Sequence, residues 1–461
     1  LMMKRTVALI AVLALAGACQ DSTGVPDLNN VSSSLLQSGL NRSSVQLLTT
    51  GLLRSDRGNL GIIFPETMAR DIYRIDSAEP RWITELIGAP ADPGGFAAGM
   101  WGGFFAEIRA ANNLIDNVPT ATDLSSAEQS ATDGLARTIK ALAYYRTLEM
   151  RDSIGIPVDV DHDLSNAPAP FVCKPNVLDY IGALLDSAQT NLQAAGSTPF
   201  PFSLPGGFTY QGDYSTPAAF MAFNRGLAGK VALYRGLDHS KPNPASFATA
   251  ITDLNAAIGP LDPAALWNSV YYVYSTAPGD ASNPMVDAAV HLNPMAGDSI
   301  ESGDLRAVEI TVRAAAVTGQ GVTTDYDYTY SIPSIGANLT RPIPVLSTAE
   351  LILLRAQAEI ASNDLASATS DINFIRTNLG GLPAYATFAD QTSAINALLY
   401  EKRYTLLGQG AQRFVDLRAY GRLNGTYLRK ETPQDIFQNA LPVPAAETNA
   451  RGGSIGTLTC N

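Results

Sequence analysis

The sequence predicts a mainly α-helical protein in which tetratricopeptide-like helix pairs alternate with long irregular loops and little β-strand. Hydrophobic residues make up 46% and charged residues 16% of the 461 residues, which is typical of a folded globular chain. Apolar side chains recur at helical spacing in many segments. Some adjacent segments also carry small residues at the positions where two antiparallel helices would cross closely.

The helical segments expected from this spacing follow one another along most of the chain. They are 33–53, 101–117, 127–151, 177–194, 217–234, 246–258, 348–361, 365–379 and 391–407. The clearest pairs are 217–234 with 246–258, and 348–361 with 365–379. Small residues on the first helix of each pair are Ala222, Gly226, Ala228, Gly229, Ala356 and Ala358. We expect degenerate repeats, an arrangement that usually serves binding rather than catalysis.

Long segments with little periodicity separate these helices: 56–99, 156–175, 198–216 and 261–342. Loops of this length in a compact protein usually carry function or short strands. Residues 307–317 alternate enough to predict one strand. Tyr326, Tyr328 and Tyr330 also alternate, which places three tyrosines on one face of an extended segment.

The N-terminus carries the pattern of an export signal. Lys4 and Arg5 precede the apolar run 7–15 and three small residues, 16–18. This run is too short to span a membrane, so 1–18 is predicted to be a secretory signal peptide. Cys19 follows directly, which is typical of a lipoprotein signal whose cysteine becomes the lipidated first residue. Ordinary secretion with a free Cys19 is the alternative.

The remaining chain divides into a polar, turn-rich tether at 19–30 and one predicted α-helical domain at 31–461. Export would place Cys173 and Cys460 in an oxidising compartment, where they can form a disulfide. The alternative is that both cysteines remain unpaired thiols.

Charge and composition exclude several classes of function. Lys and Arg number 31 against 43 Asp and Glu, so the net charge is −12. A nucleic-acid binder that relies on attraction to phosphates is not expected with this charge. Three histidines in the whole chain argue against a His-rich metal site, and no cofactor motif is present.

Several segments, in this order, resemble the SusD/RagB family of outer-membrane nutrient-binding lipoproteins. They are 101–119, 135–159, 341–381, 395–423 and 439–451. The most telling residues are Gln412, Arg413, Phe414, Asp416, Leu417 and Arg418, and then Leu441, Pro442, Pro444 and Glu447. The lipoprotein signal also stands where the family has one.

The resemblance implies a SusD-like fold in which the two sides of the domain have different functions. The helix pairs would lie against a SusC-type TonB-dependent β-barrel transporter. The loop side would capture an oligosaccharide or another small nutrient and deliver it to that barrel. The protein would be held at the outer membrane, on the cell surface, by its lipid anchor, and it would perform no catalysis.

Aromatic residues in the long loops are the candidate ligand-binding groups, because the C–H faces of sugar rings stack on aromatic planes while polar neighbours bond the hydroxyls. The candidates are Asp71, Tyr73, Arg81 and Trp82 in one group, Trp267, Tyr271 and Tyr272 in a second, and Tyr326, Tyr328 and Tyr330 in a third. The alternative is that each group packs its loop onto the helices.

The remaining motifs receive structural interpretations. Arg413 and Asp416 are expected to form a structural ion pair that holds the last helices. Three acidic residues, Asp159, Asp161 and Asp163, have calcium-loop spacing. However, Leu164 and Pro170 occupy the Gly and closing Glu positions of an EF-hand, which leaves a solvated acidic loop and an open question of calcium binding.

Two other functions stay open at this level. A secreted glycan-processing enzyme needs two converging carboxylates, which spacing alone does not exclude. The Gly-x-Ser-x-Gly pattern at 452–456 does not support a hydrolase, because no histidine follows it. The third function is a tetratricopeptide-like protein–protein scaffold, which would bind no small ligand.

Overall fold

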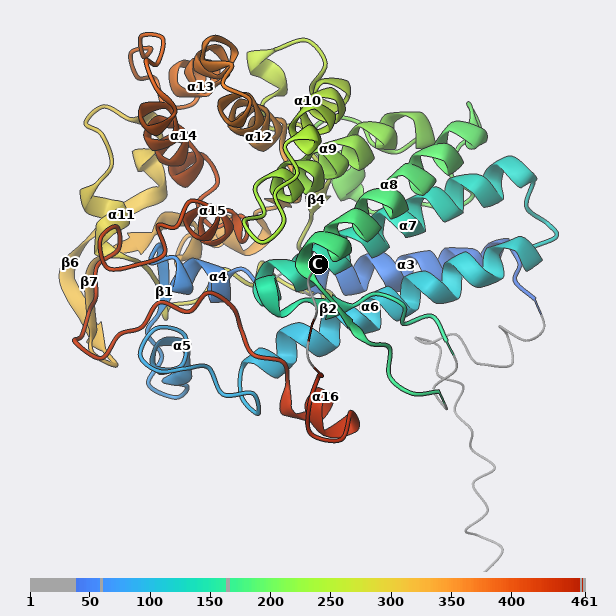
Figure 1. The fold of residues 1–461 in the computed structure, drawn as a ribbon, viewed down its shortest axis with the longest axis horizontal. Coiled ribbons are helices and arrows are strands. Elements are labelled where there is room, and N and C mark those ends of the chain that lie inside the picture. Colours follow the sequence, from blue (N-terminus) through green and yellow to red (C-terminus); the bar gives the residue numbers. More distant parts are fainter. Residues whose placement is uncertain (1–38, 59–60, 163–165, 457, 459–461) are drawn as a thin grey trace, which may run out of the picture. The chain divides into compact units, whose positions relative to one another are not determined.

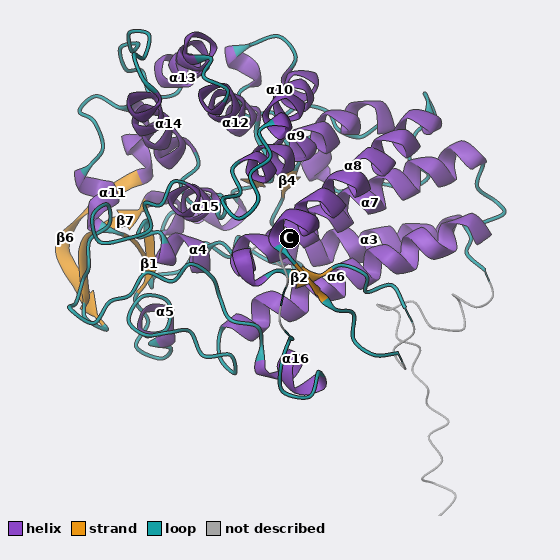
Figure 2. Ribbon diagram, in the orientation of Figure 1, coloured by secondary structure: helices purple, strands orange, loops and turns teal. Residues whose placement is uncertain are grey.

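Helices dominate the computed structural model, and its principal sheet lies at the left of the view (Figures 1 and 2). The structure describes residues 39–58, 61–162, 166–456 and 458. The predicted signal peptide, the tether and Cys19 lie outside the described residues. Residues Leu40–Asn461 form one compact unit. The prediction of a mainly α-helical fold with few strands is confirmed.

The helices and strands have the following bounds. The long helices are α3 (Arg42–Gly58), α6 (Ala97–Asn117), α7 (Ser126–Arg151), α8 (Lys174–Ala195), α9 (Pro217–Gly236), α10 (Ala245–Ile258), α12 (Thr348–Ala361), α13 (Leu365–Asn378) and α14 (Gln391–Thr405). The short helices are α4 (Ile63–Met68), α5 (Arg81–Thr84), α11 (Pro294–Asp298), α15 (Gln412–Ala419) and α16 (Ala445–Ala450). The strands are β1 (Ile72–Arg74), β2 (Ile156–Pro157), β3 (Phe171–Val172), β4 (Tyr271–Tyr272), β5 (Val290–Leu292), β6 (Ile310–Gly319), β7 (Val322–Tyr328) and β8 (Ile343–Pro344).

Local sequence signals explain where the long helices begin. Ser125 and Glu128 form a reciprocal capping box at the start of α7. Thr216, Asp364 and Asp390 each accept a hydrogen bond from a backbone N–H in the first turn of α9, α13 and α14, respectively. The short helices α4, α5, α11, α15 and α16 are not among the predicted segments, because four to eight residues are too few to display helical periodicity.

The long helices pack as successive neighbours, α6 on α7, α7 on α8, α8 on α9 and α9 on α10, and continue through α12, α13 and α14. The helix pairs α9–α10 and α12–α13 are therefore antiparallel neighbours, as predicted. Their interface in the second half is an apolar cluster that includes Ile352, Ala356, Ile372, Ile375 and Leu398, all fully buried. Burial of these side chains is the main force that holds the pairs together.

Glycines allow the closest helix crossings. A Cβ atom added at Gly229 would lie 2.6 Å from Leu254 Cγ and 3.2 Å from the carbonyl oxygen of Ala250, on the facing helix α10. A Cβ added at Gly134 of α7 would meet Leu192 of α8 at 2.7 Å. The predicted role of small residues at the α9–α10 crossing is therefore correct for Gly229.

We expect Gly229→Ala to lower the free energy of unfolding by about 1–3 kcal/mol, because the added methyl group overpacks the crossing. The matched control is Gly182→Ala in α8, where a Cβ would meet nothing within 4 Å. That change should raise stability by up to about 1 kcal/mol through helix propensity alone. Urea denaturation of both variants measures the difference, and equal effects would contradict the close crossing.

The principal sheet has four antiparallel strands in the order β1-β5-β7-β6. The predicted strand at 307–317 begins at Ile310, because the preceding residues form a 3-10 turn, Leu305–Glu309. Tyr326 and Tyr328 lie in β7, whereas Tyr330 lies in the following turn. All three tyrosines nevertheless pack against one apolar cluster, together with Ile72 and Leu292.

Within the described part of the chain, no helix is both long and apolar enough to cross a membrane.

Candidate ligand-binding site

A cavity of about 210 Å³ lies among the loops and brings together aromatic and polar side chains. Most of its lining comes from two of the long segments noted above, 198–216 and 261–342. The lining residues include Tyr210, Gln211, Trp267, Tyr271, Glu309, Tyr328, Tyr330, Arg341 and Gln409. We call this space the loop cavity.

Aromatic rings form the walls of the loop cavity. The rings of Tyr210 and Tyr271 lie 4.9 Å apart, and the Tyr271 hydroxyl donates a 2.6 Å hydrogen bond to the carbonyl oxygen of Trp267. Tyr328 and Tyr330 make an edge-to-face contact at 5.6 Å. Tyr210 keeps 51% of its surface exposed, so its ring is accessible to a ligand.

Two polar side chains in the loop cavity make no ion pair with any described residue. The guanidinium of Arg341 lies 3.3 Å above the centre of the Tyr330 ring and makes no ion pair among the described residues. Glu309 Oε2 is buried without a hydrogen-bond partner. A buried acceptor of this kind is costly unless a ligand or water satisfies it. The cavity therefore offers an aromatic surface flanked by a free donor and a free acceptor.

Burial raises the pKa of Glu309 from 4.5 to about 8, a larger effect than the opposing charges of Arg341 and Arg306. Glu309 is therefore largely protonated at neutral pH and presents both an O–H donor and a carbonyl acceptor. Both suit a ligand that carries hydroxyl groups.

We expect Glu309 to make the protein less stable as pH rises. Between pH 4.5 and about 8 the unfolded chain releases this proton while the folded chain retains it, so the free energy of unfolding falls with pH in that window. Glu309→Gln should flatten this part of the profile, as urea denaturation at pH 5 and pH 8.5 would show. Glu79→Gln is the control and should leave the slope unchanged, because burial does not raise the pKa of this half-buried carboxyl. An unchanged slope for Glu309→Gln would contradict the burial of a protonated carboxyl.

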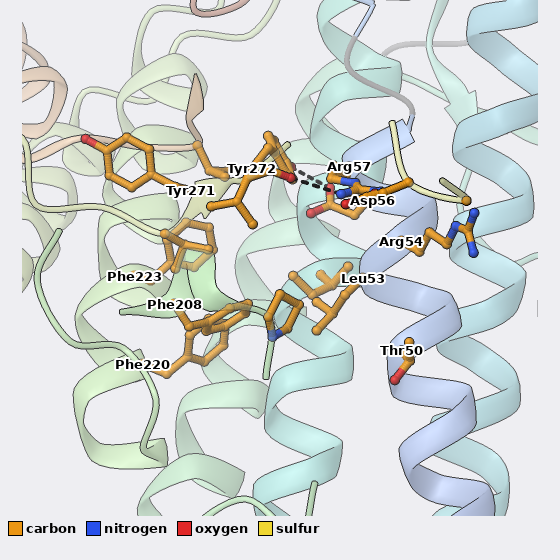
Figure 3. A pocket seen from close by; sticks show the side chains of 17 residues that line it. Thr50, Leu53, Arg54, Asp56, Arg57, Phe208, Phe220, Phe223, Tyr271 and Tyr272 are labelled. Carbon is orange, nitrogen blue, oxygen red and sulfur yellow. Dashed lines mark hydrogen bonds and ion pairs between the residues drawn. The ribbon is translucent and has the colours of Figure 1, made fainter. Parts of the chain in front are cut away.

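A second cavity of about 230 Å³ has a different character (Figure 3). Phe208, Phe220 and Phe223 line one wall and face Leu53 of α3. Its buried acid is already satisfied, because Asp56 Oδ1 accepts hydrogen bonds from the Tyr272 hydroxyl at 2.8 Å and from Arg146 at 2.6 Å. Because this acid has protein partners, the second cavity differs from the loop cavity, where Glu309 Oε2 has none.

The predicted ligand residues divide between these places. Trp267, Tyr271, Tyr328 and Tyr330 come together in the loop cavity. Tyr272 is buried and lines the second cavity. Tyr326 lies at neither, since its hydroxyl donates to Asp298 at 2.7 Å.

The first predicted group lies away from both cavities. Asp71 is 1% exposed and accepts two hydrogen bonds from Arg403, at 2.6 and 2.9 Å. Tyr73 is fully buried, and its hydroxyl donates to Glu431 at 2.8 Å. Both side chains therefore have structural partners.

Trp82 and Arg81 belong to a separate aromatic cluster. The Trp82 ring lies 4.9 Å from Phe64 and 4.6 Å from Phe96, with Arg74 above it. Arg81 is exposed and pairs with Glu79. Trp82 also packs against the apolar cluster under the sheet. For Trp82, the structure therefore fits the alternative that the aromatic residue packs its loop onto the rest of the protein.

Arg413 and Asp416 do not pair with each other, which corrects the expected ion pair. Arg413 Nε lies 3.0 Å from Asp71 Oδ2, and Asp416 Oδ2 lies 2.7 Å from Lys402 Nζ. The reason is that α15 packs between α4 and α14, so each side chain reaches a different neighbour. Both remain structural.

The remaining predictions fall partly outside the described residues. Cys173 is buried and disulfide-bonded. Cys460 lies outside the described residues, so its pairing with Cys173 stays a prediction. Asp163 lies outside them too, and no group of at least three acidic, histidine or cysteine side chains in the described chain could hold a metal ion.

Sequence reasoning missed Tyr210, Gln211, Glu309 and Arg341. Tyr210 lies in a segment already marked as a long loop, so its ring could have been added to the candidates. Glu309 and Arg341 carry no local signal, because they join the site only through the packing of the 305–309 turn and the lead into β8.

No family model matches the sequence, and no curated protein matches it. Solved structures do match. NanU of B. fragilis is 18% identical with a TM-score of 0.66, and the match covers 92% of this chain and 98% of that one. A SusD superfamily protein from Bacteroides thetaiotaomicron is 15% identical with a TM-score of 0.66, over 90% of this chain and 99% of that one.

Surface glycan-binding protein A from Bacteroides thetaiotaomicron gives a TM-score of 0.67 at 12% identity, over 88% of this chain and 97% of that one. These identities are low, but the matches span nearly the whole of each neighbour. The chain therefore has the SusD-like fold that its sequence motifs predicted.

Proposed function

We propose that this protein binds a glycan in the loop cavity and delivers it to a SusC-type TonB-dependent transporter. The single observation that carries the binding proposal is the loop cavity itself, where aromatic walls surround the unpartnered Glu309 and Arg341. Sugar rings offer apolar faces for the aromatics and hydroxyls for the polar groups. Neighbours with this fold include proteins named for surface glycan binding, which supports the same ligand class.

The lining of the loop cavity favours binding over catalysis. Glycoside hydrolysis ordinarily requires two carboxyl groups that flank the bond. Among the described residues that line the cavity, Glu309 is the only acid. Its raised pKa suits a hydrogen-bond donor, but it has no carboxylate partner across the cavity. We therefore favour a protein that binds a glycan without hydrolysing it over a glycan-processing enzyme.

A panel of neutral and acidic polysaccharides in native affinity gels tests glycan binding by the purified protein. We expect at least one polysaccharide to retard the protein, and we expect no new reducing ends after prolonged incubation. Failure to bind any polysaccharide would contradict the proposal. Release of reducing ends would favour the enzyme instead.

Delivery to a transporter and anchoring through Cys19 rest on the sequence resemblance and on the fold. A mild-detergent pull-down of the tagged, full-length protein from its own membranes tests both. We expect a stoichiometric TonB-dependent barrel, and we expect Cys19→Ser to release the protein from the membrane. Recovery of intact, membrane-bound protein without a barrel would favour the scaffold reading.

A further inference from the structure

A third cavity, of about 140 Å³, lies beside α14 and α15, away from the loop cavity. Its described lining contains three arginines, Arg403, Arg413 and Arg422, and no acidic residue. Tyr400, Tyr404 and Tyr427 supply aromatic walls, and Ser299 adds a hydroxyl. A purely cationic lining is unexpected in a chain with a net charge of −12. We call this space the arginine cavity.

Among the described residues, Asp71 is the one acid that contacts these arginines directly. Asp71 Oδ1 takes both hydrogen bonds from Arg403, and Asp71 Oδ2 lies 3.0 Å from Arg413 Nε. Glu66 also stands near this pair, but burial raises its pKa well above the ordinary value, which favours its neutral form. Three arginines therefore line the cavity, and one acid, Asp71, contacts two of them.

Two of the guanidinium groups keep unused donors. Arg413 Nε is buried and makes no hydrogen bond of good geometry, and Asp71 is the one acid among the described residues with which it forms an ion pair. Arg422 is half-buried, lies 5.0 Å from the centre of the Tyr427 ring, and makes no ion pair within the described chain. Arg422 can therefore still donate charge-assisted hydrogen bonds, which a bound anion would accept.

We propose that the arginine cavity binds a divalent oxyanion, a sulfate or phosphate group, either free or carried on a small sugar. Among its described residues the lining has three arginines and no acid, which suits an anion that several cations contact at once. Guanidinium groups present paired N–H donors that fit the oxygens of sulfate and phosphate, and such charge-assisted hydrogen bonds are among the strongest in proteins. The cavity admits one such group with a few attached atoms.

Calorimetric titration of the purified full-length protein with sodium sulfate, against sodium chloride at equal ionic strength, tests this site. We expect saturable binding of sulfate and none of chloride. Arg422→Gln should weaken sulfate about tenfold or more, because it removes a hydrogen bond to a charged group. Arg422 is the residue to change, because Arg403 and Arg413 also hold Asp71 and their loss endangers the fold.

The matched control is Arg429→Gln, which removes an exposed arginine paired with Glu431 outside the cavity lining. It should leave sulfate affinity unchanged. Absence of saturable sulfate binding would overturn the proposal, and so would equal weakening by both variants, which indicates general charge screening. Titration with glucose 6-sulfate separates the two sources: tighter binding than sulfate indicates an anion carried on a sugar, and equal binding indicates the free anion.

Discussion

Replacing Asp71 by alanine is expected to lower the free energy of unfolding by about 3–5 kcal/mol, because it leaves two buried arginines without their counter-charge. Arg403 and Arg413 are only 7% and 15% exposed at their side chains, and Asp71 is the acid that both contact. Urea denaturation with circular dichroism measures the loss. Glycan affinity of the folded fraction should not change, because Asp71 lies outside the loop cavity.

The control for this change is Asp325→Ala, at an exposed position in β7, which should alter stability by less than about 0.5 kcal/mol. A small effect of Asp71→Ala, or a large loss of glycan affinity without a loss of stability, would show that Asp71 contacts ligand instead. That outcome would support the prediction that the group of Asp71, Tyr73, Arg81 and Trp82 binds ligand.

Trp267→Ala is expected to weaken glycan binding about tenfold or more, because it removes the largest aromatic face in the loop cavity. Trp267 is only half-buried and belongs to neither of the apolar clusters described above, so its loss should change stability much less than a core substitution. Isothermal titration with the polysaccharide that binds best, and a thermal melt of the same sample, separate the two effects.

Trp82→Ala provides the comparison, because this tryptophan packs against Phe64, Phe96 and the cluster under the sheet. We expect it to lower the melting temperature and to leave glycan affinity unchanged. If instead Trp82→Ala weakens binding and Trp267→Ala does not, the ligand site lies at the Trp82 cluster.

The helical part of the fold could be predicted because its signals are local. The spacing of apolar residues predicted both ends of α12 correctly, at residues 348 and 361. The N-cap residues Thr216 and Asp390 mark where α9 and α14 begin. Small residues predicted the α9–α10 crossing, since Gly229 has no other reason to stand in a helix. The resemblance in the last third of the chain then predicted the fold as a whole.

The site could be predicted only in part, because its contacts join distant parts of the chain. Trp267 and Tyr330, which line the loop cavity, were candidates because they are aromatic residues in a long loop. Asp71 looked like a loop residue available to ligand, yet its partner Arg403 stands 332 residues further on. Nothing near Asp71 in sequence reveals that partner, so burial and pairing could not be anticipated.

A crystal structure of the protein soaked with the polysaccharide fragment that binds best tests most directly whether a glycan binds in the loop cavity. We expect sugar density in the loop cavity, with one ring against Trp267 or Tyr210 and hydroxyls within hydrogen-bond distance of Glu309 and Arg341. Sugar density at the Trp82 cluster or in the second cavity, with the loop cavity empty, would contradict it.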